Sequence, residues 1–260
     1  MADLRVAARF CGPPGVANGG FASGSLAALL GGATEVTLRR PLPLDRPLPV
    51  RGDGHGTLVV EDGGRLLAEA RPAKVPVELP AVPGTAAPPL AVPAAVTPEA
   101  AEAAAGRSRY YDAPVFPGCF VCGPARTAGD GLRVFPGRVA GRALWAAPWT
   151  PDTSVADADG RVRPEVVWAA LDCPSGIAAA EAADLPADTA VVLGRMAATL
   201  GGLPRPGDRC RVVAWPLAGD GRKLGAGSAL LGPDGEVLAA ARSVWITVVR
   251  HTVMAAGAAS

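Results

Sequence analysis

The sequence lacks an excess of charge of either sign. Its 25 Lys and Arg residues balance 24 Asp and Glu residues, so the formal net charge is +1 at pH 7 and no nucleic acid is expected as a partner. No apolar run reaches the length of about 18 residues that a transmembrane helix needs. The opening residues MADLRVAARF also lack the apolar segment of a secretory signal. We therefore expect no membrane partner and no export.

Patterns typical of disulfides and metal sites are scarce. The five cysteines are odd in number and scattered along the chain, at Cys11, Cys119, Cys122, Cys173 and Cys210, which is typical of a reduced, cytoplasmic protein. Cys119 and Cys122 have the spacing of metal ligands, but a structural zinc site needs about four ligands. No second pair exists, and His55 and His251 show no ligand spacing. We expect no metal site, and no redox role for the Cys119–Cys122 pair.

Two common enzyme classes also lack their motifs here. No Gly-x-Gly-x-x-Gly follows a candidate strand and no Walker pattern occurs, so a nucleotide-binding fold is not expected. No Gly-x-Ser-x-Gly is present, which argues against an α/β-hydrolase esterase.

The chain has enough apolar residues for a large core, at 49% hydrophobic against 19% charged. Its 260 residues allow one large domain or two ordinary ones. Proline-rich residues 78–96 read as an exposed linker. A short helix follows, with Thr97 as its N-cap and Gly106 as its end. These features predict an N-terminal domain over 1–77, a linker and helix over 78–108, and a C-terminal domain over 109–260.

The two flanks share a pattern. Asp62-Gly63 and Asp234-Gly235 each precede an apolar run that ends in Ala-Arg, and Asp-Gly between apolar runs is a strong hairpin signal. The first half reads as a helix over 19–30 before strands, and the second as a helix over 164–183 before strands. Pro174 is expected to interrupt the second helix. The expected strands are 34–40, 56–60 and 65–71, then 189–197, 209–217, 222–231 and 236–249. The order predicts α+β units in which an antiparallel sheet wraps a helix.

The string CFVCGPARTAGDGLRVFPG, residues 119–137, resembles the beginning of hotdog-fold acyl-CoA thioesterases. That family often has Cys-Phe-x-Cys-Gly before a strand that begins with Gly-Leu and ends with Phe, which would be Gly131 to Phe135 here. The resemblance covers residues 5–77 and 119–249. It implies two tandem hotdog domains that form a pseudo-dimeric double hotdog.

The family's central helix opens with His-Gly-Gly, and an acidic residue follows nine positions after the histidine. The first half has Asn18, Gly19 and Gly20 at the opening, and the second half has Asp172 at the acidic position. The family builds one site from the glycine of one unit and the carboxylate of the other. The resemblance therefore implies that Gly19 N–H binds the thioester oxygen, with Asn18 and Gly20 beside it. Asp172 would act as general base or nucleophile.

A pair of hotdog units would have a second, symmetry-related site, built from the beginning of the second helix and the middle of the first. In this sequence that second site is incomplete. Counting nine residues forward from Asn18 reaches Ala27, which has no carboxylate. Counting nine back from Asp172 reaches Arg163, followed by Pro164, which has no N–H to donate. We expect one working site, not two.

Plain structural roles remain open for these residues. Asn18 is also a good helix N-cap, and Asp172 could be an ordinary helix aspartate. Ser175 and Gly176, one turn after Asp172, are candidates for binding substrate or water, although a helix serine needs no such role. Arg222 and Lys223 form a basic turn that could meet the phosphates of coenzyme A or remain solvated.

The sequence predicts a hydrolase of acyl-CoA or another acyl thioester. Coenzyme A would enter only as part of the substrate, and no other cofactor is expected. A non-catalytic acyl-binding protein of the same fold is the main alternative. A hydratase is weaker, because the hydratases pair an aspartate with a histidine a few residues on, and no histidine follows Asp172 before His251. A homo-oligomer is left open.

Overall fold

The computed structural model describes residues 2–73, 90–93, 95–108 and 113–256. Its elements, in chain order, are β1 (Ala2–Leu4), η1 (Ala8–Phe10), α1 (Gly19–Leu30), β2 (Thr34–Leu38), β3 (Leu48–Gly52), β4 (Leu58–Asp62), β5 (Arg65–Pro72), α2 (Pro98–Ala105), β6 (Gly137–Arg138), β7 (Trp145–Trp149), η2 (Thr153–Val155), α4 (Pro164–Ala182), β8 (Thr189–Leu200), β9 (Cys210–Asp220), β10 (Lys223–Leu231), β11 (Val237–Val249) and α5 (Arg250–Ala256). None of the helices among these residues is both long and apolar enough to cross a membrane.

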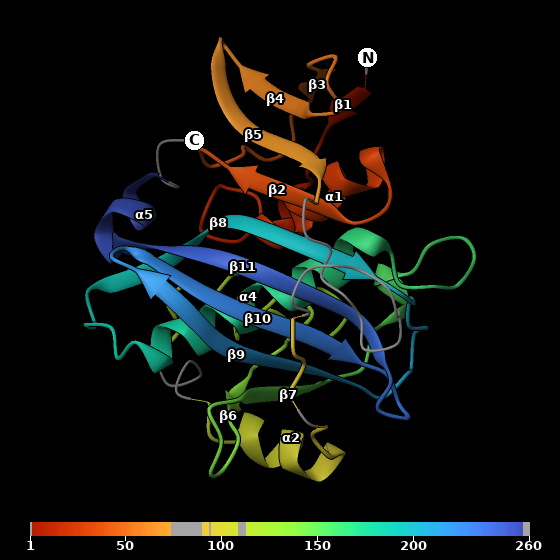
Figure 1. The fold of residues 1–260 in the computed structure, drawn as a ribbon, viewed down its shortest axis with the longest axis vertical. Helices are drawn as coiled ribbons and strands as arrows, with labels where there is room; N and C mark the ends of the chain where they lie inside the picture. The colour runs from red at the N-terminus through yellow and green to blue at the C-terminus, as the bar shows by residue number, and fades with distance from the viewer. Residues whose placement is uncertain (1, 74–89, 94, 109–112, 257–260) are drawn as a thin grey trace.

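The strands form one antiparallel sheet in the order β1-β3-β4-β5-β2-β8-β11-β10-β9-β7-β6 (Figure 1). The first five come from the N-terminal part of the chain and the other six from the C-terminal part. The two sets meet where β2 pairs with β8, with Thr34 opposite Ala198 and Thr37 opposite Arg195. The structure is thus a large antiparallel sheet with few helices, as expected for a hotdog fold.

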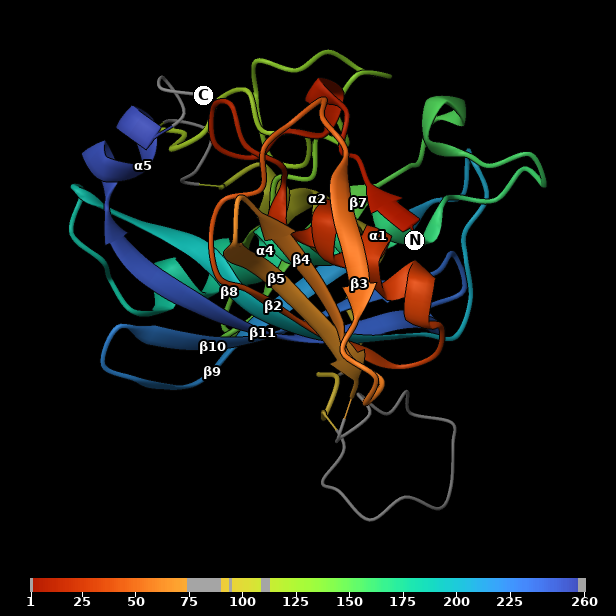
Figure 2. The same ribbon diagram turned by 90° about the horizontal axis from the view of Figure 1, so that it is seen from above.

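Both long helices lie on the same face of the curved sheet (Figure 2). Helix α1 spans the predicted residues, and α4 ends one residue before its predicted end. The prediction that Pro174 interrupts the second helix is wrong, because α4 continues through it. Residues on all sides of α4 are buried, and this packing outweighs the hydrogen bond that the proline cannot donate.

Helices α1 and α4 pack too closely for side chains at two positions of α1. A Cβ atom on Gly20 would lie 2.4 Å from Asp172 Cβ, and one on Gly24 would lie 2.6 Å from Glu165 Cα. Glycine at these positions costs helix stability, about 1 kcal/mol each relative to alanine. In return, the beginning of α1 lies directly against Asp172.

Two sequence predictions are wrong in detail. Gly131 to Phe135 do not form a strand, because Arg133 has a positive φ of 56° and the segment instead hydrogen-bonds the turn that carries Cys119. Residues 78–96 are not all exposed, since Leu90 and Val96 are buried at 4% and 3% exposure. Residues 78–89 and 94 lie outside the described residues.

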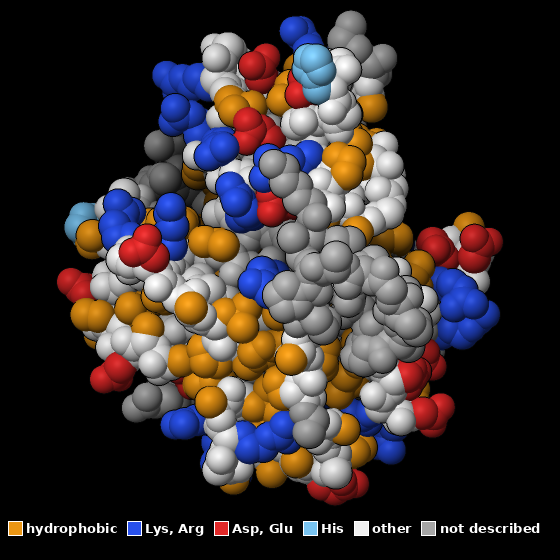
Figure 3. All heavy atoms as spheres, viewed as in Figure 1, with side chains coloured by type: hydrophobic (Ala, Val, Ile, Leu, Met, Phe, Trp, Pro, Cys, Tyr) orange, Lys and Arg blue, Asp and Glu red, His pale blue; other side chains and the backbone are white. Residues whose placement is uncertain are grey.

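Leu90 and Val96 belong to a second apolar cluster on the outer face of the sheet, opposite α1 and α4. Helix α2 packs there against β7, with Thr97 as its N-cap as predicted. Apolar side chains also gather over β9, β10 and β11 on the face seen in Figure 3.

Candidate active site

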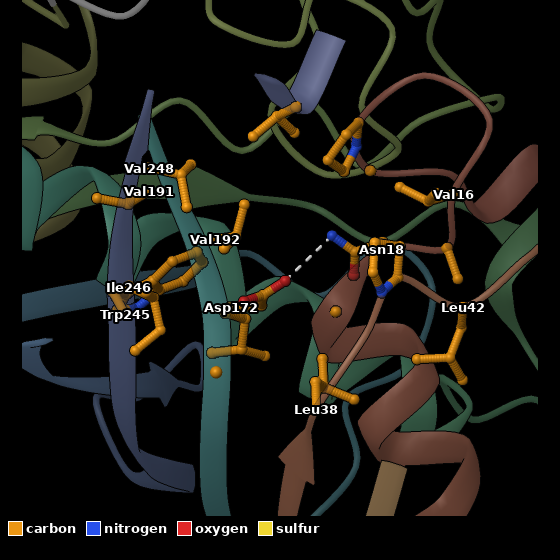
Figure 4. Close-up of a pocket in the computed structure, with 18 of the residues that line it drawn as sticks. Val16, Asn18, Leu38, Leu42, Asp172, Val191, Val192, Trp245, Ile246 and Val248 are labelled. Carbon is orange, nitrogen blue, oxygen red and sulfur yellow. Dashed lines mark hydrogen bonds between the residues drawn. The ribbon is translucent and has the colours of Figure 1, made fainter. Parts of the chain in front are cut away.

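Asn18 and Asp172 face each other from the beginning of α1 and the middle of α4 (Figure 4). Asn18 is the N-cap of α1, as its Oδ1 accepts a hydrogen bond from Phe21 N at 2.9 Å. Its Nδ2 donates to Asp172 Oδ2 at 3.1 Å. Gly20 N donates to the same oxygen at 2.8 Å. The N-cap interpretation of Asn18 is therefore confirmed, and the same side chain also holds the carboxylate.

Asp172 is a buried carboxyl group, with 2% of its surface exposed. Burial raises its pKa to about 7, and the nearby Cys119 also raises it. Hydrogen bonds from Gly20 N–H and the Asn18 amide oppose that rise. Oδ1 has no hydrogen-bond partner among the described residues. One oxygen is thus fixed by two donors, while the other is buried without a partner among the described residues.

Gly19 is the first residue of α1, so its N–H lies outside the helix's own hydrogen bonds. Gly20 N–H is already bonded to Asp172, whereas no described residue accepts a hydrogen bond from Gly19 N–H. The positive end of the helix dipole adds to the attraction for a negative oxygen at this point. Of the two glycines, Gly19 therefore has the N–H that is available to a ligand.

A cavity of about 410 Å³ opens beside these groups. It is lined by Asn18, Gly19, Asp172, Cys119 and Cys173. Apolar side chains make up most of the remaining wall, among them Val16, Leu38, Leu42, Val191, Val192, Trp245, Ile246 and Val248 (Figure 4). A volume in this range and a mostly apolar wall with few polar groups are typical of small-molecule sites.

Ser175 and Gly176 lie behind this cavity. The Ser175 hydroxyl donates to the Asp172 carbonyl oxygen at 2.7 Å and accepts from Trp245 Nε1 at 2.9 Å. A second cavity, of about 230 Å³, lies nearby. Ser175 is fully buried and lines neither cavity. Gly176 lines the second cavity, and a Cβ atom on this residue would lie 2.7 Å from the Trp245 ring. Both residues therefore have packing roles in the structure.

Arg222 and Lys223 do not line either cavity. They lie at the turn between β9 and β10, where Arg222 donates through Nε and Nη2 to Thr247 O. The cationic residues that line the larger cavity are Arg39 and Arg40, directly after β2. Arg39 also pairs with Glu69 at 2.8 Å. Sequence reasoning missed these two arginines, because nothing in the string TLRRP marks them as facing a cavity.

Three cysteines meet beside Asp172. The sulfur atoms of Cys119, Cys122 and Cys173 all lie within 4.8 Å of one another, and Cys119 Sγ is 3.6 Å from Cys173 Sγ. Hydrogen bonds with the thiols of Cys122 and Cys173 hold the pKa of Cys119 well below its usual range. The sequence did not indicate this cluster, because Cys173 lies on another element and far along the chain.

The beginning of α4 differs from that of α1. Its N-cap is Arg163, whose side chain makes no capping hydrogen bond, and Pro164 follows. The Arg163 guanidinium lies over the Phe10 ring, 5.2 Å from its centre. The beginning of α4 therefore has a cationic and an aromatic side chain, where the beginning of α1 has the Asn18 amide.

No protein-family model matches the sequence, and no curated protein matches it. Among solved structures, a putative thioesterase from Novosphingobium aromaticivorans aligns over 94% of both chains at 14% identity, with a TM-score of 0.53. A hypothetical thioesterase from Streptococcus pneumoniae, solved with coenzyme A, is 8% identical over 42% of this chain and 83% of its own, with a TM-score of 0.37. An acyl-ACP thioesterase from Bacteroides thetaiotaomicron is 21% identical over 42% of this chain, with a TM-score of 0.36, and this chain spans 47% of it. The match over 94% of the chain shows that this chain shares the fold of that putative thioesterase, as the sequence resemblance predicts.

Proposed function

We propose that this protein hydrolyses an acyl thioester, with acyl-CoA as the substrate class, at one site between α1 and α4. The observation that carries the proposal is the Asp172 carboxylate. It is buried on an apolar cavity, fixed through Oδ2 by Gly20 N–H and Asn18 Nδ2, and close to the unused N–H of Gly19. Buried acidic groups are rare without a partner or a purpose.

The geometry supports a simple reaction. The carbonyl oxygen of the thioester would accept a hydrogen bond from Gly19 N–H, which stabilises the negative charge that develops on that oxygen during attack. The Asp172 carboxylate would either take a proton from the attacking water or attack the carbonyl carbon itself. In both routes the C–S bond breaks, and the thiolate leaves and takes up a proton. When water attacks, the acyl group leaves directly as a carboxylic acid. When Asp172 attacks, the acyl group is first held as an anhydride on Asp172, and a water molecule then hydrolyses that bond, which releases the acid and restores the carboxylate.

We further propose that the chain is a tandem double hotdog, with domains over 1–77 and 109–260 and a connecting segment over 78–108. Each half supplies one long helix and one set of strands to the continuous sheet. The active site would then take Asn18, Gly19 and Gly20 from the first half and Asp172 from the second. Pro164 and Ala27 lack the groups that a second site would need.

Arg39 and Arg40 support coenzyme A as the carrier of the acyl group. They line the cavity close to the protein surface, and guanidinium groups are well suited to phosphate. In this proposal the acyl chain lies against the valines and leucines of the wall, and the phosphates of coenzyme A lie toward the arginines.

Release of free thiol from a panel of acyl-CoAs tests this function. The panel should include aliphatic and aromatic acyl groups, together with the same acyl groups on a short thiol that has no phosphates. We expect turnover of at least one acyl-CoA and slower turnover of its phosphate-free counterpart. Binding of acyl-CoA without any turnover would contradict the proposal and support the non-catalytic acyl-binding alternative.

A further inference from the structure

The cysteine cluster, Cys119, Cys122 and Cys173, is not used by the proposed hydrolysis. Two of its members come from one short turn, and the third comes from α4, next to Asp172. The cluster is mostly buried, with Cys119 and Cys122 at 2% and 3% exposure. The sequence predicted no metal site because it shows no ligands beyond the Cys119–Cys122 pair. A third thiol beside that pair makes a metal site far more plausible on chemical grounds.

The distances fit a metal ion. Zinc bonds thiolate sulfur at about 2.3 Å in a tetrahedral site, which holds two sulfur ligands about 3.8 Å apart. Cys119 Sγ and Cys173 Sγ are 3.6 Å apart, and all three sulfur atoms lie within 4.8 Å of one another. Only small side-chain movements would bring the three thiolates around one ion.

The turn that carries Cys119 and Cys122 is built to present both sulfur atoms to one side. Gly123 N donates to Cys119 O at 2.9 Å and closes the turn. A Cβ atom on residue 123 would lie 2.4 Å from Cys119 O and 2.5 Å from Pro117 O, so only glycine fits there.

Asn18 supplies a donor to the cluster. Its Nδ2 lies 3.6 Å from Cys173 Sγ and 3.9 Å from Cys119 Sγ. Three thiolates around a divalent cation carry a net charge of −1, which a buried site must compensate with hydrogen-bond donors. The Asn18 amide provides part of that compensation.

We propose that Cys119, Cys122 and Cys173 bind one zinc ion as thiolates. The protons that the three thiols still carry are released to solvent on binding. Cys119 and Cys173 line the cavity that contains Asp172, so the fourth ligand is a water molecule or another small ligand that enters from this cavity. Three protein ligands and one open position are the arrangement of reactive zinc sites, whereas structural sites are closed by four.

Metal binding by the reduced full-length chain tests this inference. The chain is stripped with a chelator in the presence of a phosphine reductant, loaded with zinc, and dialysed before elemental analysis. We expect one zinc ion per chain. Loading with cobalt(II) instead should give a thiolate-to-cobalt charge-transfer band whose intensity corresponds to three thiolates. A chain that retains no metal, or a cobalt spectrum with a different number of thiolates, would overturn the inference.

Serine variants locate the ion. Cys122→Ser and Cys173→Ser should each weaken zinc binding by more than the roughly 10–100-fold that loss of an outer hydrogen-bond partner costs. Cys210→Ser is the control, because Cys210 is a buried thiol on β9 outside the cluster, and it should leave binding unchanged. Equal weakening by all three substitutions would overturn the assignment. If a cluster variant fails to fold, the thiolate count in the wild-type cobalt spectrum decides. Neither measurement uses a substrate, so their outcome is separate from the proposed hydrolysis.

Discussion

Replacing Asp172 by asparagine should lower the turnover of acyl-CoA by at least about 10²–10⁴-fold, the range that a positioned acid-base group contributes. The amide has nearly the same shape and can still accept the hydrogen bonds of Gly20 N–H and Asn18 Nδ2. It can neither take a proton from water nor attack a carbonyl carbon. The melting temperature should therefore stay within a few degrees while turnover is lost, and a thiol-release assay beside thermal unfolding measures both.

Asp159→Asn is the matched control for this variant. Asp159 lies in an exposed loop between η2 and α4, and its substitution should change neither turnover nor melting temperature. Near-normal turnover in Asp172→Asn would show that this carboxylate does not carry the chemistry. Equal loss in both variants would point to a general effect of removing an acidic charge.

Replacing Gly20 by alanine should destabilise the protein, although alanine is the better helix former. Helix propensity alone would stabilise α1 by about 1 kcal/mol. The new Cβ atom, however, would lie 2.4 Å from Asp172 Cβ and 2.7 Å from Trp168 O, so α1 and α4 must move apart. Forcing extra atoms into a packed core costs about 1–3 kcal/mol. We expect a lower melting temperature and, because Asp172 is displaced, lower turnover.

The direction in which Gly20→Ala changes the stability distinguishes the cost of packing an extra Cβ atom from the gain in helix propensity. Gly52→Ala in β3 is the control, since a Cβ atom there meets nothing within 4 Å, and its stability should change by less than about 0.5 kcal/mol. A Gly20→Ala variant as stable as the wild type would mean that the two helices do not need the close approach seen in the structure.

Local sequence signals predicted the positions of the two long helices well. The candidate site was predicted only through the family resemblance. Asn18 before two glycines marks a helix N-terminus by its capping chemistry alone, and the structure places α1 as expected. The juxtaposition of Asn18 with Asp172, 154 residues away, depends on how two helices pack, which no local pattern records. The nine-residue spacing of the hotdog thioesterases identified both ends of that contact.

The roles of the two glycines could not be separated by sequence. Gly19 and Gly20 are the same residue type in adjacent positions. Gly19 lines the cavity and Gly20 lies against Asp172, because successive residues of a helix are rotated by about 100°. The same limit applies to Cys173. Its side chain lies beside Cys119 and Cys122 because of how α4 is rotated about its axis and where the turn of residues 119–123 runs. Neither can be predicted from local sequence patterns.

A crystal structure with a non-hydrolysable acyl-CoA analogue, in which a methylene group separates the carbonyl from sulfur, is the most direct test of the proposed site. We expect one analogue per chain, with its carbonyl oxygen within hydrogen-bond distance of Gly19 N and its carbonyl carbon beside the Asp172 carboxylate. The beginning of α4, with Arg163 over Phe10 and Pro164 as the first helical residue, should hold none. An analogue at both helix beginnings, or a carbonyl group away from Gly19 and Asp172, would contradict the proposed site.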